Sequence, residues 1–265
     1  MCTLSVISRD NGYLLGMNRD EKIARGAGTP PEAREFGGTK AIYPSDGDRG
    51  TSISGTCISR TWIGANEHAV ALALLNWNDV VVGAVDVPKN RSRGLVIPAL
   101  IGCHSLAGVR EALDVLELAG MPPFRLVGVF PSERQICEWR WNSRQMEFLL
   151  HGWEVRQWFS SSLSDKQAER RRGATYHDAW NEADAGSVPW LRRLHASHAG
   201  APGPFSLCVH RSDVRTLSYS EIECTSAVVR MEHFVGSPCE RTVGDPIETK
   251  CDYRLDLRLR NVGTE

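Results

Sequence analysis

The first 17 residues contain two short strand-like runs, at 3–8 and 13–17, on either side of Asn11-Gly12. An Asn-Gly pair between two apolar runs is a favoured two-residue β-hairpin turn. In such an antiparallel pair, the end of the second strand returns to the start of the first. We therefore expect Cys2 to begin a strand, with Arg19 and Asp20 beside it.

The rest of the chain has more strand-like than helical segments, without βαβ alternation or internal repeats. Ser164 and Gln167 form a capping-box pattern at the start of one predicted helix. Residues 18–56 are rich in Gly, Pro and charge, and we interpret them as a long surface excursion. We expect strands at 62–66, 69–75, 124–130, 135–141, 146–150, 205–210, 215–220 and 224–234, and helices at 105–118, 164–180 and 188–195. This pattern predicts one α+β domain, residues 1–265, built on stacked antiparallel sheets.

The composition excludes several classes of partner. A formal net charge of -1 over 265 residues gives no general attraction to nucleic acid or to an anionic membrane. The longest apolar stretches, such as 69–75 and 95–101, fall well short of the roughly 20 residues of a membrane span. The start of the chain turns polar at once and does not resemble a secretory signal. We therefore expect a cytoplasmic protein with small-molecule partners.

The eight cysteines are scattered without a Cys-x-x-Cys pair, and we expect them to be reduced. Cys2 differs from the rest, because removal of Met1 is expected before so small a side chain and would make it the first residue. Its α-amine then has a pKa of about 7.7 to 8.0 and its thiol one of about 8.5. One residue would thus hold a nucleophile and a base. The alternative is an incidental or packed cysteine.

A second candidate element follows the predicted hairpin, at Asn18-Arg19-Asp20-Glu21. Asp20 is placed to hold or orient the α-amine of Cys2, and Arg19 to stabilise a thiolate or a substrate carboxylate. The alternative interpretation is that both are solvated charges at a turn.

Other motifs carry less weight. His195 and His198 share one face of a predicted helix, but no further ligand lies at zinc-site spacing. Cys208-x-His210 offers ligands for haem iron, yet no haem-attachment motif is present. The run 170–172, three arginines, is interpreted as a solvated helix face. We therefore predict neither a metal site nor a cofactor.

Five motifs occur in an order and at spacings similar to those of a known family. They are Met1-Cys2, the segment 18–21, Thr-Trp-Ile-Gly at 61–64, Leu75-Asn76, and Ser-Arg-Gly-Leu-Val at 92–96. Together they resemble the NRDE family of TANGO2-like (transport and Golgi organisation 2 related) proteins. The resemblance extends more distantly to bile-salt hydrolases and penicillin V acylases. It implies an αββα four-layer sandwich, N-terminal nucleophile hydrolase-like, with Cys2 at the edge of a sheet.

The resemblance also implies roles for individual residues. Asp20 would contact the amino group of the nucleophile, Asn76 would donate a side-chain N–H to the oxyanion, and an arginine late in the chain would complete the site. Arg211 is the best match for that arginine, with Arg215 as a competitor. One departure is that residues 160–164 read Ser-Ser-Ser-Leu-Ser, without the asparagine that many relatives have there.

These features favour an amidohydrolase that acts on a non-peptide C–N bond of a small amide. Cys2 would attack the carbonyl, its own amine would shuttle the proton, and Asn76 would stabilise the oxyanion. The competing hypothesis is a non-catalytic protein that uses the same cleft for a haem or lipid-like ligand, because the resemblance implies such links for some members.

Overall fold

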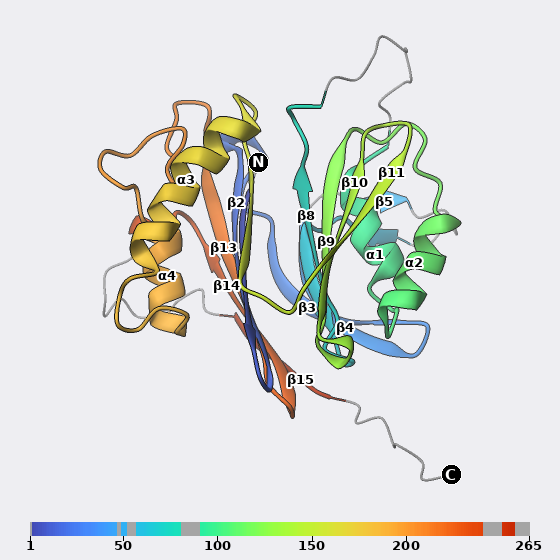
Figure 1. Ribbon diagram of the computed structural model, residues 1–265. Helices are drawn as coiled ribbons and strands as arrows, with labels where there is room; N and C mark the ends of the chain where they lie inside the picture. Colours follow the sequence, from blue (N-terminus) through green and yellow to red (C-terminus); the bar gives the residue numbers. More distant parts are fainter. Residues whose placement is uncertain (1, 47–48, 52–56, 81–90, 241–250, 258–265) are drawn as a thin grey trace.

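The computed structural model describes residues 2–46, 49–51, 57–80, 91–240 and 251–257. Met1, whose removal the sequence leads us to expect, lies outside these residues, as does part of the predicted surface excursion. Two antiparallel sheets face each other, with helices α3 and α4 outside the first sheet and α1 and α2 outside the second (Figure 1). The four layers confirm the predicted αββα sandwich.

The first sheet is built around the N-terminal hairpin. Its order is β12 (Arg156–Ser160), β1 (Cys2–Arg9), β2 (Gly12–Lys22), β13 (Val214–Cys224), β14 (Val228–Val235) and β15 (Cys251–Asp256). The predicted hairpin is confirmed, but its turn is Asp10-Asn11 and not Asn11-Gly12, because Arg9 pairs with Gly12. A Cβ on Gly12 would lie 2.1 Å from the main-chain oxygen of Cys224. The register places Cys2 opposite Arg19 on one side and opposite Ser160 on the other.

The second sheet has seven strands, and two of them fall inside the predicted surface excursion. Its order is β11 (Met146–His151), β10 (Gln135–Trp141), β9 (Phe124–Phe130), β8 (Ala71–Asn76), β7 (Ile63–Asn66), β4 (Thr39–Ser45) and β3 (Thr29–Phe36). The interpretation of 18–56 as a surface excursion was therefore wrong for 18–22, which belong to β2, and for 29–45. Gly37 and Gly38, both at positive φ, turn a hairpin there, and Pro30 and Pro31 are tolerated because β3 is an edge strand. The short strands β5 (Arg49–Thr51) and β6 (Cys57–Ser59) form a separate pair.

Alternating side chains place the main core between the sheets. Leu4 and Val6 of β1 face inward and pack with buried apolar residues of the second sheet, such as Leu75 and Val127. Ile7 faces the other way, toward the helices. Both faces of the central strands are buried, because each sheet is covered by helices on its outer side.

The helices follow from capping and apolar spacing. They are α1 (Val96–Leu100), α2 (Leu106–Asp114), α3 (Asp165–Ala179) and α4 (Val188–Ala196), with single 3-10 turns at Ile23–Arg25, Arg93–Leu95, Pro131–Glu133 and Pro238–Glu240. The predicted cap of α3 is confirmed, because the Ser164 hydroxyl accepts the N–H of Gln167 at 3.2 Å. In the described part of the chain, no helix combines the length and apolar character that crossing a bilayer requires.

Several predicted boundaries were wrong. Helix α2 ends before the predicted residue 118, because the chain turns at Val115, whose side chain is 85% exposed. The segment 205–210 is no strand and forms only isolated bridges, at Val209 and His210. The predicted strands 215–220 and 224–234 are instead β13 and β14, with their turn at 225–227. Helix α1 and strands β12 and β15 were not predicted.

Two histidines in the interior resist protonation. His195 is fully buried, and its Nε2 lies 2.9 Å from the hydroxyl of Ser5. Burial lowers the pKa of His195 from 6.5 to about 3, and the charge of Arg172 acts in the same direction. Burial, with a contribution from Arg19, lowers the pKa of His233 to about 4. As the pH falls below 6.5, the unfolded chain binds protons that the folded chain does not bind, so stability falls.

We predict that acid destabilises this protein through these imidazoles. Between pH 6.5 and pH 5, each should remove about 2 kcal/mol from the free energy of unfolding. Urea unfolding at both pH values measures the loss, and His195→Gln should reduce it by about 2 kcal/mol. His177→Gln serves as the control, because this side chain is exposed on α3. An equal loss in the wild type and the His195→Gln variant would contradict the prediction.

Candidate active site

Cys2 begins β1 and lies between β2 and β12 in the first sheet. Its residue is 6% exposed, and its main-chain N–H donates to the Ser160 hydroxyl at 2.9 Å. Burial raises the pKa of the Cys2 thiol above 9.0, and Asp20 adds to the shift, while nearby positive charges, including Arg19, oppose it. The thiol therefore stays protonated at neutral pH unless a base takes its proton.

A cavity of about 100 Å³ opens beside Cys2. Four of the five predicted site residues, Cys2, Arg19, Asp20 and Asn76, lie in its wall. The other described residues that line it are Glu21, Arg25, Asp46, Arg60, Thr61, Trp62, Leu74, Ser92, Arg93 and Gly94. The two sheets thus supply the predicted residues to one small, strongly charged cavity.

Arg211, the fifth predicted residue, is not among the described residues of this wall. Its side chain donates to Ser162 at 3.3 Å and pairs with Asp213 at 2.9 Å. The chain turns back here, since the Arg211 N–H donates to the carbonyl of Val214. Arg215, the competitor, pairs with Glu240 and does not line the described wall either. Neither arginine is therefore found beside Cys2, where the family resemblance led us to expect one.

Arg19 is held rigidly and is only 5% exposed. Its guanidinium donates to the carbonyl of Gly26 at 2.9 Å and pairs with Asp46, and it lies 4.5 Å from the centre of the Trp62 ring. A solvated turn charge would have none of these contacts. Arg19 therefore presents a fixed positive charge to the cavity.

Asp20 is buried behind Cys2. Its Oδ1 accepts a hydrogen bond from the Thr216 hydroxyl at 2.7 Å, and its Oδ2 lies 3.5 Å from Nη1 of Arg172. Oδ2 has no hydrogen-bond partner among the described residues. Burial raises the pKa of the Asp20 carboxyl above 3.8, and the Arg172 charge opposes this shift most strongly. Oδ2 is thus ion-paired with Arg172 but accepts no hydrogen bond from the described residues.

Arg172, the partner of Asp20, is a site residue that the sequence analysis missed. It was interpreted as part of a solvated helix face, but its residue is 1% exposed. Its Nη1 donates to the Thr3 hydroxyl at 2.8 Å and, at 3.4 Å, to the carbonyls of Cys2 and Ser160. Buried positions in α3 fall at 165, 168 and 172, a helical spacing that could have identified it.

Asn76 ends β8, and the segment after it is clasped to the start of α3. The Asp165 carboxylate accepts the N–H groups of Asn78 and Asp79 at 2.6 and 3.1 Å. The Asp79 carboxylate in turn accepts the N–H groups of Asp165 and Lys166 at 3.0 and 2.8 Å. These reciprocal hydrogen bonds hold the end of β8, in the second sheet, close to the start of α3, which covers the first sheet.

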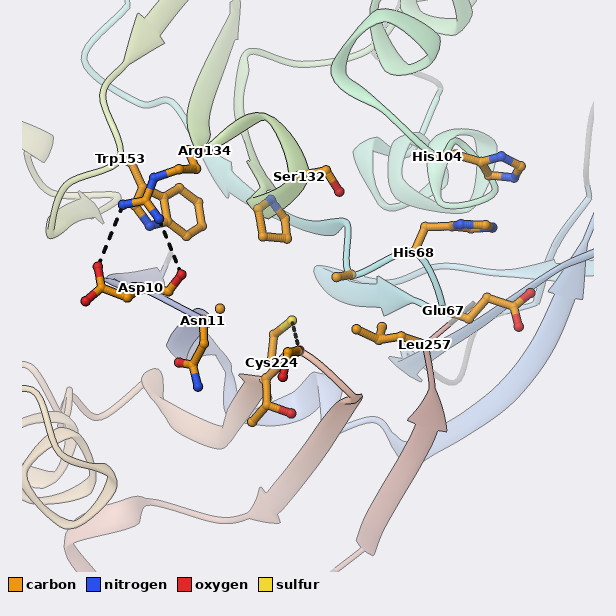
Figure 2. A pocket seen from close by; sticks show the side chains of 15 residues that line it. Asp10, Asn11, Glu67, His68, His104, Ser132, Arg134, Trp153, Cys224 and Leu257 are labelled. Atoms are coloured by element: carbon orange, nitrogen blue, oxygen red, sulfur yellow. Dashed lines mark hydrogen bonds and ion pairs between the residues drawn. The ribbon is translucent and has the colours of Figure 1, made fainter. Parts of the chain in front are cut away.

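A larger cavity, of about 300 Å³, lies at the turn end of the β1–β2 hairpin (Figure 2). Trp153 and Arg134 stand on one side above Asp10, while the rings of His68 and His104 stack 3.9 Å apart on the other. It shares no described residue with the cavity beside Cys2. Its cysteine, Cys224, is a poor nucleophile because burial raises its pKa to about 12. The cavity beside Cys2 is therefore the better candidate active site.

Comparison with known proteins supports the fold. The sequence matches no protein-family model and no curated protein. An Arg-to-Leu variant of conjugated bile acid hydrolase from Clostridium perfringens is similar in structure, with a TM-score of 0.50, 11% identity, and 99% of this chain and 100% of that chain covered. This similarity shows that the two proteins share a fold.

Two further solved structures have lower scores. A Cys-to-Ala variant of the same hydrolase gives a TM-score of 0.46 at 10% identity, over 99% of this chain and 100% of that chain. Penicillin V acylase from Agrobacterium tumefaciens gives 0.49 at 14% identity, over 97% and 86%.

We predict that Arg172 holds the site together. Arg172→Ala should lower the free energy of unfolding by about 3–5 kcal/mol, because it leaves the Asp20 carboxylate buried without its counter-charge. Arg171→Ala, the adjacent exposed arginine of α3, should change it by less than about 0.5 kcal/mol. Urea unfolding of the two variants at pH 7 makes the comparison. Similar losses in both would contradict a buried ion pair.

Proposed function

We propose that this chain is a cytoplasmic cysteine amidohydrolase of the NRDE, TANGO2-like, type that acts on a non-peptide C–N bond of a small linear amide. The observation that carries this proposal is the convergence of Cys2, Arg19, Asp20 and Asn76 on one cavity. The family motifs support it from the sequence, and the N-terminal nucleophile fold supports it from the structure.

Removal of Met1 would convert the main-chain nitrogen of Cys2 into a free α-amine. That nitrogen already donates to the Ser160 hydroxyl. The amine would take the proton of Sγ, and the thiolate would attack the carbonyl carbon of the amide. The oxyanion that forms would accept a hydrogen bond from the side-chain N–H of Asn76.

Collapse of this intermediate breaks the C–N bond. The α-ammonium of Cys2 gives its proton to the leaving nitrogen, which departs as an amine, and the acyl group remains on Sγ as a thioester. Water then attacks the thioester, with the α-amine as the base, and releases a carboxylic acid and the thiol. The Oδ2 atom of Asp20 is the acceptor that would hold the ammonium between these steps.

The lining of the cavity favours a short polar substrate. Four guanidinium groups, at residues 19, 25, 60 and 93, and three carboxylates, at residues 20, 21 and 46, surround about 100 Å³. A carboxylate or similar anionic group on the acyl part would suit a wall that has one more guanidinium than carboxylate. A haem or lipid-like ligand needs a larger apolar surface, so the charged lining does not favour the binding hypothesis.

The first test concerns Cys2 itself. We expect intact-mass measurement of the purified protein to show that Met1 is absent. A screen of small amides and acyl thioesters should then find turnover that Cys2→Ala abolishes and Cys103→Ala retains, since Cys103 does not line the cavity. Retention of Met1, or equal turnover by the Cys2→Ala variant, would contradict the proposal.

The second test concerns the oxyanion. Asn76→Ala should lower kcat by about 10²–10³-fold, which corresponds to the loss of one donor to the tetrahedral intermediate. KM should change little, because this hydrogen bond strengthens only in the transition state. Asn181→Ala, an exposed asparagine at the end of α3, is the control and should keep the wild-type kcat. A fall in kcat below threefold for Asn76→Ala would exclude this role.

A further inference from the structure

Four side chains with metal-binding atoms meet away from the Cys2 cavity. His198 follows α4, Cys208 and His210 lie in the segment before β13, and Cys239 lies in the 3-10 turn after β14. Their ligand atoms all lie within 4.8 Å of one another. The chain thus brings two thiols and two imidazoles together from three segments.

The separations fit a single tetrahedral cation. Bond lengths of about 2.3 Å for Zn–S and about 2.0–2.1 Å for Zn–N place neighbouring ligand atoms about 3.3–3.8 Å apart in a tetrahedron. The two Sγ atoms of Cys208 and Cys239 are 3.4 Å apart. Nε2 of His210 lies 3.6 Å from Sγ of Cys208 and 3.1 Å from Sγ of Cys239. Three of the four ligands therefore need to move by only a few tenths of an ångström.

The fourth ligand carries a second, independent sign of a missing partner. Nε2 of His198 is buried and has no hydrogen-bond partner among the described residues. The His198 ring stands at 69° to the His210 ring, with the ring centres 5.0 Å apart. Buried imidazole nitrogens are normally hydrogen-bonded or bound to a metal. A cation between the two rings would satisfy this atom.

We propose that His198, Cys208, His210 and Cys239 bind one Zn²⁺ ion in a closed, structural site. Two thiolates and two neutral imidazoles balance the charge of the ion, as suits a partly buried position. Four protein ligands leave no open position for a substrate. Binding to Nε2 leaves the ring proton of His210 on Nδ1, which then cannot accept a hydrogen bond from the Arg215 side chain 3.5 Å away, and Arg215 keeps Glu240 as its partner.

No metal site was predicted from the sequence, because His198 was paired with His195, and Cys208 and His210 were weighed only as ligands for haem iron. The structure separates them, since Nε2 of His195 faces the Ser5 hydroxyl. The real set is spread over 42 positions, from 198 to 239, and only Cys208 and His210 are close in sequence. Such a set does not follow any short zinc-binding spacing.

The proposed ion would also stabilise the two segments that hold Thr216, the hydrogen-bond donor to Asp20. Val209, between two of the ligands, donates its N–H to the Thr216 hydroxyl at 2.8 Å, and that hydroxyl donates to Asp20 at 2.7 Å. Ser237, two residues before the ligand Cys239, donates to the carbonyl of Thr216 at 2.9 Å. The ion would fix both segments that hold Thr216, and through it the Asp20 carboxyl.

Metal analysis of the full-length protein tests the site. We expect about one zinc per chain after purification under reducing conditions, or after reconstitution and removal of loosely bound metal with a chelator. Cys239→Ser should lower the content at least tenfold, whereas Cys103→Ser should leave it unchanged. Replacement by Co²⁺ should give the absorption of a tetrahedral thiolate complex in the wild type and not in the Cys239→Ser variant.

A stability measurement on the native chain avoids dependence on one variant. Zinc in excess over the chelator-treated protein should raise Tm by roughly 5 °C or more in the wild type and leave Tm of Cys239→Ser unchanged. A wild type that retains no zinc after reconstitution would overturn the proposal. So would a Cys208–Cys239 disulfide found by mass under reducing conditions.

The Cys2→Ala variant separates this proposal from the proposed function. It should bind zinc as the wild type does, whatever its activity, because Cys2 is not a ligand. Loss of zinc in Cys2→Ala would place the metal in the cavity beside Cys2 and would overturn the assignment to these four residues.

Discussion

The buried ion pair between Asp20 and Arg172 is the contact on which the rest of the site depends. Both side chains are withdrawn from water, and removal of two charges from water costs more than their attraction returns unless hydrogen bonds complete the pair. Thr216 supplies one such bond to Asp20, and Thr3 and two main-chain carbonyls supply the others to Arg172. The pair therefore forms only when β1, β2, β12, β13 and α3 are all in place. Cys2 lies at their junction, so its surroundings are set by the assembly of the whole first half of the sandwich.

Neither sheet makes the cavity alone. The first sheet contributes Cys2, Arg19 and Asp20, while the second contributes Asn76 and the Trp62 ring on which Arg19 rests. At this end, reciprocal hydrogen bonds join residues 78–79, which follow the second sheet, to the start of α3, which covers the first sheet. The apolar core between the sheets provides the driving force for their packing, but it is non-directional. Directional contacts, such as this clasp and the hydrogen bond from the Tyr13 hydroxyl to the Ala69 carbonyl, help to fix the position of one sheet relative to the other.

Local signals in the sequence predicted the parts of the site that depend on local geometry. Asn11-Gly12 indicated the hairpin, although its turn is Asp10-Asn11, and the observed register brings Arg19 and Asp20 to Cys2. The resemblance to the NRDE family added Asn76, which no pairing rule links to Cys2. Arg172 was missed because a run of three arginines indicates a solvated surface unless the helical spacing of the buried positions is considered. With that spacing, only Arg172 of the three arginines lies on the buried face of α3.

The other wrong predictions have a common physical origin: the sequence pattern does not show where the chain reverses direction. Residues 205–210 have the alternation of a strand, but the chain bends back at His210, and Arg211 is carried away from Cys2. Conversely, Gly37-Gly38 was interpreted as part of a loop although it joins two strands of the second sheet. Glycine marks a turn in both a loop and a hairpin, and only the partner strand decides between them. Contacts between distant segments, such as those that gather His198 and Cys239, lie beyond any local pattern.

Removal of Met1, as proposed, would turn the Cys2 nitrogen from a peptide nitrogen into an amine with additional hydrogens. A peptide nitrogen has one hydrogen, which the Ser160 hydroxyl accepts. Oδ2 of Asp20, close enough for its charge to act on the Cys2 thiol, has no hydrogen-bond partner among the described residues. An α-ammonium has three hydrogens, so two remain besides the one that Ser160 accepts, and the proposal assigns one of them to this carboxylate. Its positive charge would also favour the ionised form of an aspartate whose burial otherwise raises its pKa. Arg172 and the proposed ammonium would thus stabilise the buried Asp20 carboxylate together.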